Sequence, residues 1–329
     1  MKNLIDLHVH TSCSDGTLPP EEVVATALDL QLAAIAITDH DTAAGVARAK
    51  AAVRHLNSTP NNLIMDTTQD NPHLANTSGR DSQPQNTTGR DSQTQSTSGR
   101  DSQKTLEILA GIEISAEWLN KEIHILGLDL DPDHPALKNY QDEFLREKEE
   151  RNRKIAEKIT AVGCPVTPEE IQERFPGAVL GRPHYARFMM EKGFVTSVNA
   201  AFNQYLGDNG PCYVSRRRIS VSDAVKLILD CGGHPVLAHP LQYGFSKDRL
   251  ESLVNYLKDF GLEGMECYYS RYTATDSAKL IKMAGRHGLF VTGGSDFHGG
   301  NKPEIALGSG INGNLEIPYS LLQDAGLRP

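Results

Sequence analysis

The stretch that decides the fold is Leu4-Ile5-Asp6-Leu7-His8-Val9-His10-Thr11-Ser12-Cys13-Ser14-Asp15-Gly16, close to the N-terminus. Its first half is rich in strand formers, and a strand sends residues i and i+2 to the same side. We therefore expect the imidazoles of His8 and His10 to point together. Asp15 follows after a short polar turn, where Gly16 lets the chain fold back at little steric cost. The alternative is a buried strand with two incidental histidines.

Four later stretches repeat this pattern of an apolar run that carries, or ends in, imidazole or carboxylate. They are Ala33 to Thr38 followed by Asp39-His40-Asp41-Thr42, Leu106 to Gly111 followed by Ile112-Glu113-Ile114-Ser115 with His124 in the next strand, His234 to Ala238 followed by His239-Pro240, and Leu289 to Gly294 followed by Ser295-Asp296-Phe297-His298. A parallel α/β barrel assembles its active site where its strands end. The repeated pattern therefore predicts one site built from several strands.

The order H-x-H…D, T-D-H-D, G-I-E-I-S, H-I-L-G, L-A-H-P, G-S-D-F-H resembles the PHP (polymerase and histidinol phosphatase) phosphoesterases, within the amidohydrolase-like metal hydrolases. The resemblance spans most of the chain. It implies an α/β fold, a distorted (β/α)7-type PHP barrel with an inserted helical subdomain, and an enzyme that is a metal-dependent phosphoric ester hydrolase. More narrowly, Gly181-Arg182-Pro183-His184, Tyr205 to Asp208 and Tyr213 to Arg218 resemble the branch that hydrolyses 3′,5′-nucleotide bisphosphates and trims short RNA from its 5′ end.

The pattern contains imidazole and carboxylate without thiolate, which suits Mn²⁺, Fe²⁺ or Zn²⁺, and the ligands are too many for one ion. We expect two to three divalent transition metals, with Mn²⁺ preferred. The resemblance implies three ligand sets: His8, His10, Glu113 and Asp296; Asp15, His40 and His298; and Glu113, His124 and His239. It also implies catalytic roles for Asp15, His40, His239 and Asp296. Hydroxide generated at the metals is the expected nucleophile.

The expected substrate is a nucleotide or a short RNA. We predict hydrolysis of phosphomonoesters, above all the 3′-phosphate of nucleoside 3′,5′-bisphosphates, or trimming of short 5′-phosphorylated RNA. Arg182 and His184 are candidates because Pro183 would open a helix whose first-turn N–H groups favour an anion and arginine can clamp phosphate. The resemblance implies that they are the substrate-binding residues. Alternatively, Arg182 pairs with an acid and His184 packs. The alternative functions are a histidinol-phosphate phosphatase or other small-molecule phosphatase, a C–N hydrolase, and a non-catalytic PHP regulatory module.

Composition limits the possible partners and compartment. Lys plus Arg at 33 against Asp plus Glu at 42 gives a net charge of −9, so any nucleotide must be attracted by local charge. Five scattered cysteines without a C-x-x-C argue against a disulfide framework and a zinc ribbon. We find no secretory leader pattern at the N-terminus and no apolar run near the ~18 residues of a membrane span. We therefore predict a cytoplasmic protein with no membrane contact and no evident stable protein partner.

Strand and helix signals alternate in residues 1–56, 105–128 and 216–310, and this alternation favours a parallel sheet or barrel. The resemblance implies that these residues form the PHP barrel. Residues 57–104 nearly lack apolar side chains and repeat a decapeptide, so we expect a disordered low-complexity insertion. Residues 129–215 have a helical texture and predict an inserted subdomain over the barrel mouth, beginning with a long, interrupted helix from Pro135 to Val162. Residues 311–329 form a C-terminal tail.

Several neighbours of the motifs keep simpler interpretations. Cys13 is more plausible as a small packing residue than as a thiolate ligand. Asp39 and Asp41 either orient imidazoles, or Asp41 caps the next helix. Arg216-Arg217-Arg218 is either solvated or contacts a phosphate, and Tyr268, Tyr269 and Arg271 are candidates for base stacking or phosphate binding. The remaining histidines are predicted to be structural or solvated, namely His55, His73, His134, His234 and His287.

Overall fold

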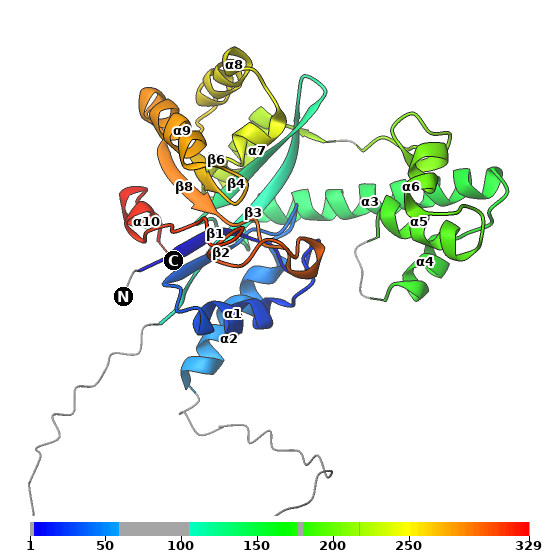
Figure 1. Ribbon diagram of the computed structural model, residues 1–329, viewed down its shortest axis with the longest axis horizontal. Coiled ribbons are helices and arrows are strands. Elements are labelled where there is room, and N and C mark those ends of the chain that lie inside the picture. The colour runs from blue at the N-terminus through cyan, green and yellow to red at the C-terminus, as the bar shows by residue number, and fades with distance from the viewer. Residues whose placement is uncertain (1–2, 59–104, 177–179, 217, 329) are drawn as a thin grey trace, which may run out of the picture.

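The computed structural model describes residues 3–58, 105–176, 180–216 and 218–328 (Figure 1). Its sheet runs in the order β1 (Ile5–Val9), β2 (Ala34–Ile37), β3 (Glu107–Trp118), β4 (Lys121–Leu128), β6 (His234–Leu237), β7 (Gly264–Tyr269) and β8 (Phe290–Gly294), and β5 (Ile219–Ser220) pairs with β3. β8 returns to β1, where the Asp296 N–H donates to the His8 carbonyl at 2.9 Å and Val9 bridges Phe297. The sheet thus nearly closes into a barrel, and the predicted α/β class is confirmed.

One strand departs from the parallel arrangement that the β-α alternation favours. β4 is antiparallel to both β3 and β6, whereas the other strand pairs are parallel. Leu119 and Asn120 alone connect β3 to β4, and a two-residue connection makes a hairpin, since a parallel crossover needs a dozen residues or more. The reversal has a consequence for the site. The beginning of β4, with His124, lies at the edge of the sheet where the parallel strands end.

Five helices pack around the outside of the sheet (Figure 1), namely α1 (Pro20–Asp29), α2 (Ala44–Ser58), α7 (Val221–Asp230), α8 (Lys247–Lys258) and α9 (Ala274–His287). Local chemistry explains their ends. α1 begins at Pro20 with two acids in its first turn, which suits the positive end of a helix dipole. α9 begins with a capping box between Thr273 and Asp276, and it is capped at its C-terminus by Gly288, whose φ of 61° favours glycine.

The second part of the structure is helical. α3 (Pro135–Ala161) is one continuous helix of 27 residues, so the predicted interruption is wrong. After Pro135 it contains no proline or glycine that would break it. Leu137 near its start lies in the barrel core, while Ile155 and Ile159 near its end lie in a second hydrophobic cluster. That cluster includes α4 (Pro168–Arg174), α5 (Arg182–Glu191), α6 (Val198–Ala201) and η1 (Phe202–Leu206), which lie beside the barrel in Figure 1.

The last residues close the opposite end of the barrel from the predicted site. Ile317 and Leu322 are buried with Ile5 and Leu7 in a third hydrophobic cluster, and α10 (Ser320–Asp324) lies there. The Ile5 N–H donates to the Ile317 carbonyl at 2.9 Å. The segment predicted as a tail therefore packs against the first strand, although the domain boundaries themselves stay a prediction.

Two predictions concern residues outside this description. His73 and nearly all of the 57–104 insertion lie outside the described residues.

Among the described helices, we find none that is both long enough and apolar enough to cross a membrane.

Candidate metal centre

The nine residues predicted as ligands meet at the end of the barrel where the parallel strands finish. They are supplied by β1 (His8 and the following His10 and Asp15), the end of β2 (His40), the middle of β3 (Glu113), the start of β4 (His124), the residue after β6 (His239) and the loop after β8 (Asp296 and His298). The alternation of β1 brings its two imidazoles to one side as predicted, with the Nε2 atoms of His8 and His10 3.1 Å apart. Every one of the nine contacts at least one other.

Glu113 is the centre of this cluster. Its side chain is buried, and its two oxygens contact five imidazoles. Oε2 lies 3.4, 3.2 and 3.1 Å from nitrogens of His8, His10 and His40, and Oε1 lies 2.9 and 3.0 Å from nitrogens of His124 and His239. Five strands therefore meet through one carboxylate.

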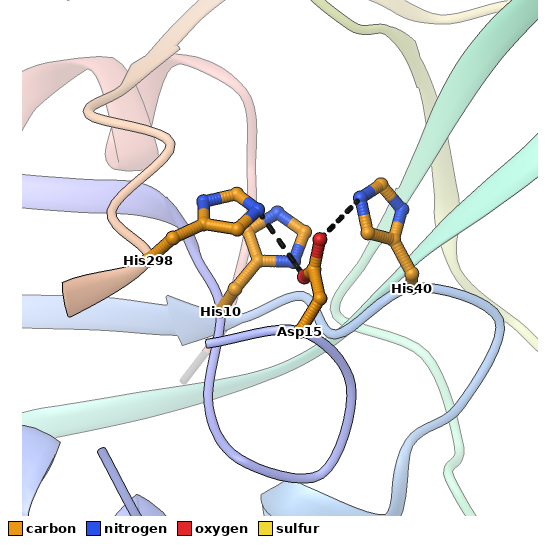
Figure 2. Close-up of side chains that lie close together, drawn as sticks. All are labelled: His10, Asp15, His40 and His298. Carbon is orange, nitrogen blue, oxygen red and sulfur yellow. Dashed lines mark ion pairs between the residues drawn. The ribbon is translucent and has the colours of Figure 1, made fainter. Parts of the chain in front are cut away.

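Asp15 gathers a second group at the exposed side of the cluster (Figure 2). Its Oδ1 lies 3.2 Å from His298 Nε2 and 3.5 Å from His10 Nδ1, and its Oδ2 lies 3.8 Å from His40 Nε2. One donor atom of each of these four residues lies within 4.8 Å of the others. Asp15 is 53% exposed, so this group faces the solvent side of the cluster.

The geometry groups the ligands somewhat differently from the resemblance. Compact sets form from His10, Asp15, His40 and His298, from His8, His10 and Glu113, and from His40, Glu113 and His124. The first contains one expected set with His10 added. The third has His40 in the place of His239, although His239 itself lies 3.0 Å from Glu113. The division of the ligands among individual ions stays a prediction.

The charges of the cluster are strongly coupled. Burial alone lowers the pKa of an imidazole, but neighbouring carboxylates outweigh it and raise the pKa of His10 to about 9 and of His124 to about 10. At His40 burial dominates and lowers the pKa to about 4. Burial works against ionisation of Glu113 and Asp296, yet the imidazoles around them hold both carboxyl pKa values well below the usual range. The cluster thus holds carboxylates that attract cations.

Unsatisfied atoms indicate what kind of cation fits. Several buried atoms of the cluster lie close to other cluster atoms without forming a hydrogen bond. Among the described residues, the buried atoms that lack a hydrogen-bond partner include His10 Nδ1, His40 Nδ1, Glu113 Oε2 and His239 Nδ1. Buried polar atoms are rarely left unpaired in proteins. Imidazole and carboxylate donors so closely spaced suit divalent transition metals, and the residues present fit such ions.

Comparison with known proteins decides the family. A model of the PHP domain matches residues 6–151. The 5′-3′ exoribonuclease Rnm of Escherichia coli (strain K12) is 30% identical over 295 residues, which are 90% of this chain and 85% of that protein. The chain belongs to the PHP family.

This PHP chain is also similar to a second curated protein and to a solved structure. The 3′,5′-nucleoside bisphosphate phosphatase of Chromobacterium violaceum is 30% identical over 302 residues, covering 89% of this chain and 87% of that protein. A solved amidohydrolase structure from Chromobacterium violaceum, with bound sulfate, has a TM-score of 0.67 and 27% identity and covers 98% of this chain and 96% of its own. The chain is a metal-dependent phosphoesterase, as the resemblance in its sequence implied.

A cavity of about 1070 Å³ lies between the nine-residue cluster and the helical block, the part formed by the end of α3 with α4, α5, α6 and η1. Asp15, His40 and His124 line it on the barrel side, and Arg182 and His184 line it on the other. The structure therefore brings both predicted substrate-binding residues to the cavity that contains three of the nine cluster residues.

Arg182 and His184 also make local contacts, as the alternative interpretation predicted when it paired Arg182 with an acid. Arg182 Nη1 donates to Asp208 Oδ1 at 2.9 Å and to the Leu206 carbonyl at 3.1 Å. His184 Nδ1 accepts from the Gly181 N–H at 3.2 Å, just where α5 begins. Arg182 therefore pairs with an acid and lines the cavity at once, and its role toward substrate stays a prediction.

Sequence reasoning missed two side chains that support the cluster. Glu266, in the middle of β7, contacts His8 and the backbone of His239. A lone acid inside an otherwise uncharged strand was the available signal. Lys302 donates to Asp296 Oδ2 at 2.7 Å, from a loop with no recognisable motif. Tyr269, a sequence candidate for base stacking or phosphate binding, is buried and donates to the same Asp296 oxygen at 2.8 Å.

The acids beside His40 have roles other than those predicted. Asp39 accepts from the Thr11 N–H at 2.7 Å and from the Ser14 hydroxyl at 2.6 Å, which fixes the loop that carries Asp15. Asp41 accepts from the Ser115 N–H at 2.9 Å, from Tyr140 and from Arg216. Within the described ranges neither carboxylate hydrogen-bonds an imidazole, and Asp41 does not cap α2.

The other residues whose roles the sequence left undecided make local contacts. Cys13 Sγ lies 3.8 Å from Arg48, and burial raises the pKa of its thiol, which agrees with a packing role. Arg218 pairs with Glu122 at 2.6 Å and, like Arg216, lines the cavity, whereas Arg217 lies outside the described residues. The other contacts are those of His134 at the start of α3, His234 with Glu263, His287 with Glu251, and Arg271 with Glu304.

Proposed function

We propose that this PHP enzyme hydrolyses phosphomonoesters of nucleotides, preferring the 3′-phosphate of nucleoside 3′,5′-bisphosphates, and that it also trims short 5′-phosphorylated RNA. One observation carries the proposal. Six basic residues line the cavity that begins at the cluster. Lys148, Arg151, Lys154 and Arg182 belong to the helices away from the barrel, whereas Arg216 and Arg218 lie near the cluster and pair with Asp41 and Glu122. A nucleotide with a reacting phosphate at the cluster and a second phosphate some ångströms away matches that distribution of charge. Two relatives are named for these same two activities.

The proposal includes two to three divalent ions, with Mn²⁺ as the preferred metal and Fe²⁺ or Zn²⁺ as alternatives. Their proposed ligands are His8, His10, Asp15, His40, Glu113, His124, His239, Asp296 and His298. When bound, such ions supply a hydroxide nucleophile at neutral pH and neutralise charge on the phosphoryl oxygens.

The chain's own side chains orient this chemistry. Tyr269 and Lys302 both donate to Asp296 Oδ2, so Oδ1 is the oxygen left toward the cluster, 3.3 Å from His10 Nε2. Asp15 and His40 are partly exposed and line the cavity, so substrate reaches the cluster on their side. We assign the reacting phosphate to a position between Asp15, His40, His239 and Asp296.

A substrate panel tests the proposal. Mn²⁺-loaded protein is assayed on adenosine 3′,5′-bisphosphate, adenosine 3′- and 5′-monophosphate, histidinol phosphate and a 5′-phosphorylated trinucleotide RNA. The highest kcat/KM is expected on the bisphosphate, with release of its 3′-phosphate. A highest value on histidinol phosphate would favour the small-molecule phosphatase. Bound metal without hydrolysis of any substrate would favour a non-catalytic module.

A further inference from the structure

Glu266 is a buried carboxylate inside the barrel that joins two residues of the cluster. It lies in the middle of β7, between the neighbouring strands β6 and β8, and its side chain is fully buried. One oxygen, Oε1, lies 3.0 Å from His8 Nδ1, and the other, Oε2, accepts from the His239 N–H at 2.7 Å. A carboxylate removed from water needs such partners, and both partners here are cluster residues.

The first contact decides which nitrogen of His8 faces the cluster. An ionised carboxylate only accepts hydrogen bonds, so the hydrogen in this contact is on His8 Nδ1. In the neutral ring the bare nitrogen is then Nε2, the atom that lies 3.4 Å from Glu113 and 3.6 Å from Asp296. Metal ions bind the bare nitrogen of an imidazole, and the partner of the other nitrogen selects the tautomer.

The second contact holds a strained backbone. His239 follows β6 with φ 28° and ψ 55°, a left-handed conformation that residues other than glycine rarely adopt. In this conformation its N–H donates to Glu266 Oε2 at 2.7 Å. There its imidazole Nε2 lies 3.0 Å from Glu113 Oε1. Strain of this kind persists where the surrounding structure enforces it.

We infer that Glu266 is a positioning residue, which sets the metal-binding tautomer of His8 and the placement of His239 through the two oxygens of one carboxylate. The inference rests on the proposed metal cluster and goes beyond it, because Glu266 itself is no ligand in that proposal. A carboxylate that only stabilised the fold would leave the tautomer and the metal affinity unaffected.

Glu266→Gln is the variant to test, because glutamine keeps the shape but one of its two terminal atoms is an NH2 that cannot accept a hydrogen bond. Zn²⁺ affinity of metal-free protein, measured against a competing chelator, is expected to fall roughly 10- to 100-fold. Glu263→Gln is the matched control. Glu263 binds His234 Nδ1 at 2.6 Å, the same type of pair outside the cluster, and its loss is expected to leave Zn²⁺ affinity unchanged.

The tautomer is read directly from the ring nitrogens of His8 by ¹⁵N NMR on the Zn²⁺-loaded protein. Wild type is expected to carry the His8 proton on Nδ1. A proton on Nε2 in wild type overturns the inference even if the Gln variant does not fold. Equal Zn²⁺ affinity of wild type and Glu266→Gln also overturns it, while leaving the proposed function intact. A wild type that binds no Zn²⁺, Mn²⁺ or Fe²⁺ at all would instead remove the proposed function and this inference together.

Discussion

Replacing Arg182 with alanine should reduce selectivity for a substrate with two phosphates. Arg182 is 28% exposed in the cavity wall, and within the described residues both of its hydrogen bonds come from Nη1. A guanidinium carries five N–H donors, so Nε and Nη2 remain for a phosphate. A charge-assisted contact contributes about 1.5–3 kcal/mol, so kcat/KM for adenosine 3′,5′-bisphosphate should fall roughly 10- to 150-fold. In the proposed function the reacting phosphate lies at the cluster and not at Arg182, so p-nitrophenyl phosphate should be hydrolysed almost as before.

Initial rates on both substrates, with Mn²⁺ saturating, measure this difference. Arg174→Ala is the matched control, because Arg174 makes a similar ion pair with Glu191 at 2.9 Å in the same helical block and does not line the cavity. Its loss should change neither rate. The partner Asp208 is 78% exposed, so losing the ion pair itself costs little stability. Equal losses on both substrates in Arg182→Ala would refute the reasoning, since Arg182 would then act on the reacting phosphate or on the fold.

Three other predictions concern the cluster and the insertion. Glu113→Gln should remove nearly all metal binding and hydrolysis, because five imidazoles lose their shared anion, and metal analysis after gentle purification that finds wild-type content would contradict this. Metal binding at pH 7 should release protons, and affinity should rise with pH, because the pKa of His10 is raised to about 9 and that of His124 to about 10 in the metal-free protein. Calorimetry in buffers of different ionisation enthalpy measures the release, and identical heats in all buffers would count against it. Deleting Thr59 to Gln103 should leave Tm and kcat/KM close to those of the full chain, because so polar a segment offers a core little to bury. A fall of more than about 5 °C in Tm, which corresponds to roughly 3 kcal/mol in a chain of this size, would show otherwise.

The feature best predicted from the sequence is that the nine candidate ligand residues meet at one end of the barrel. Strand periodicity places His8 and His10 on one side of β1, and the ends of parallel strands meet at one edge. Those two rules bring together residues as distant in sequence as His10 and His298, whose rings stack with centroids 4.0 Å apart. Neither rule depends on side-chain detail, which is why they work from sequence alone.

The parts that escaped prediction depend on information that periodicity does not contain. Strand direction is invisible in an alternating pattern, and only the short Leu119-Asn120 connection signalled that β4 reverses. Glu266 acts from the middle of a strand, away from the strand ends where functional residues are sought. Lys302 reaches Asp296 because its loop folds back, which is a matter of tertiary contacts.

The length of α3 sets the distance between the barrel and the helical block. Its start is fixed in the barrel core at Leu137 and its other end in the helical cluster at Ile155, with Lys148 and Arg151 lining the cavity between them. At about 1.5 Å per residue, the 18 positions from Leu137 to Ile155 span roughly 27 Å. One added residue would turn the far block by about 100°, whereas a full added turn would restore its facing and move it about 5.4 Å outward. With its orientation kept, the helical block can therefore move away from the barrel only in steps of about one helical turn.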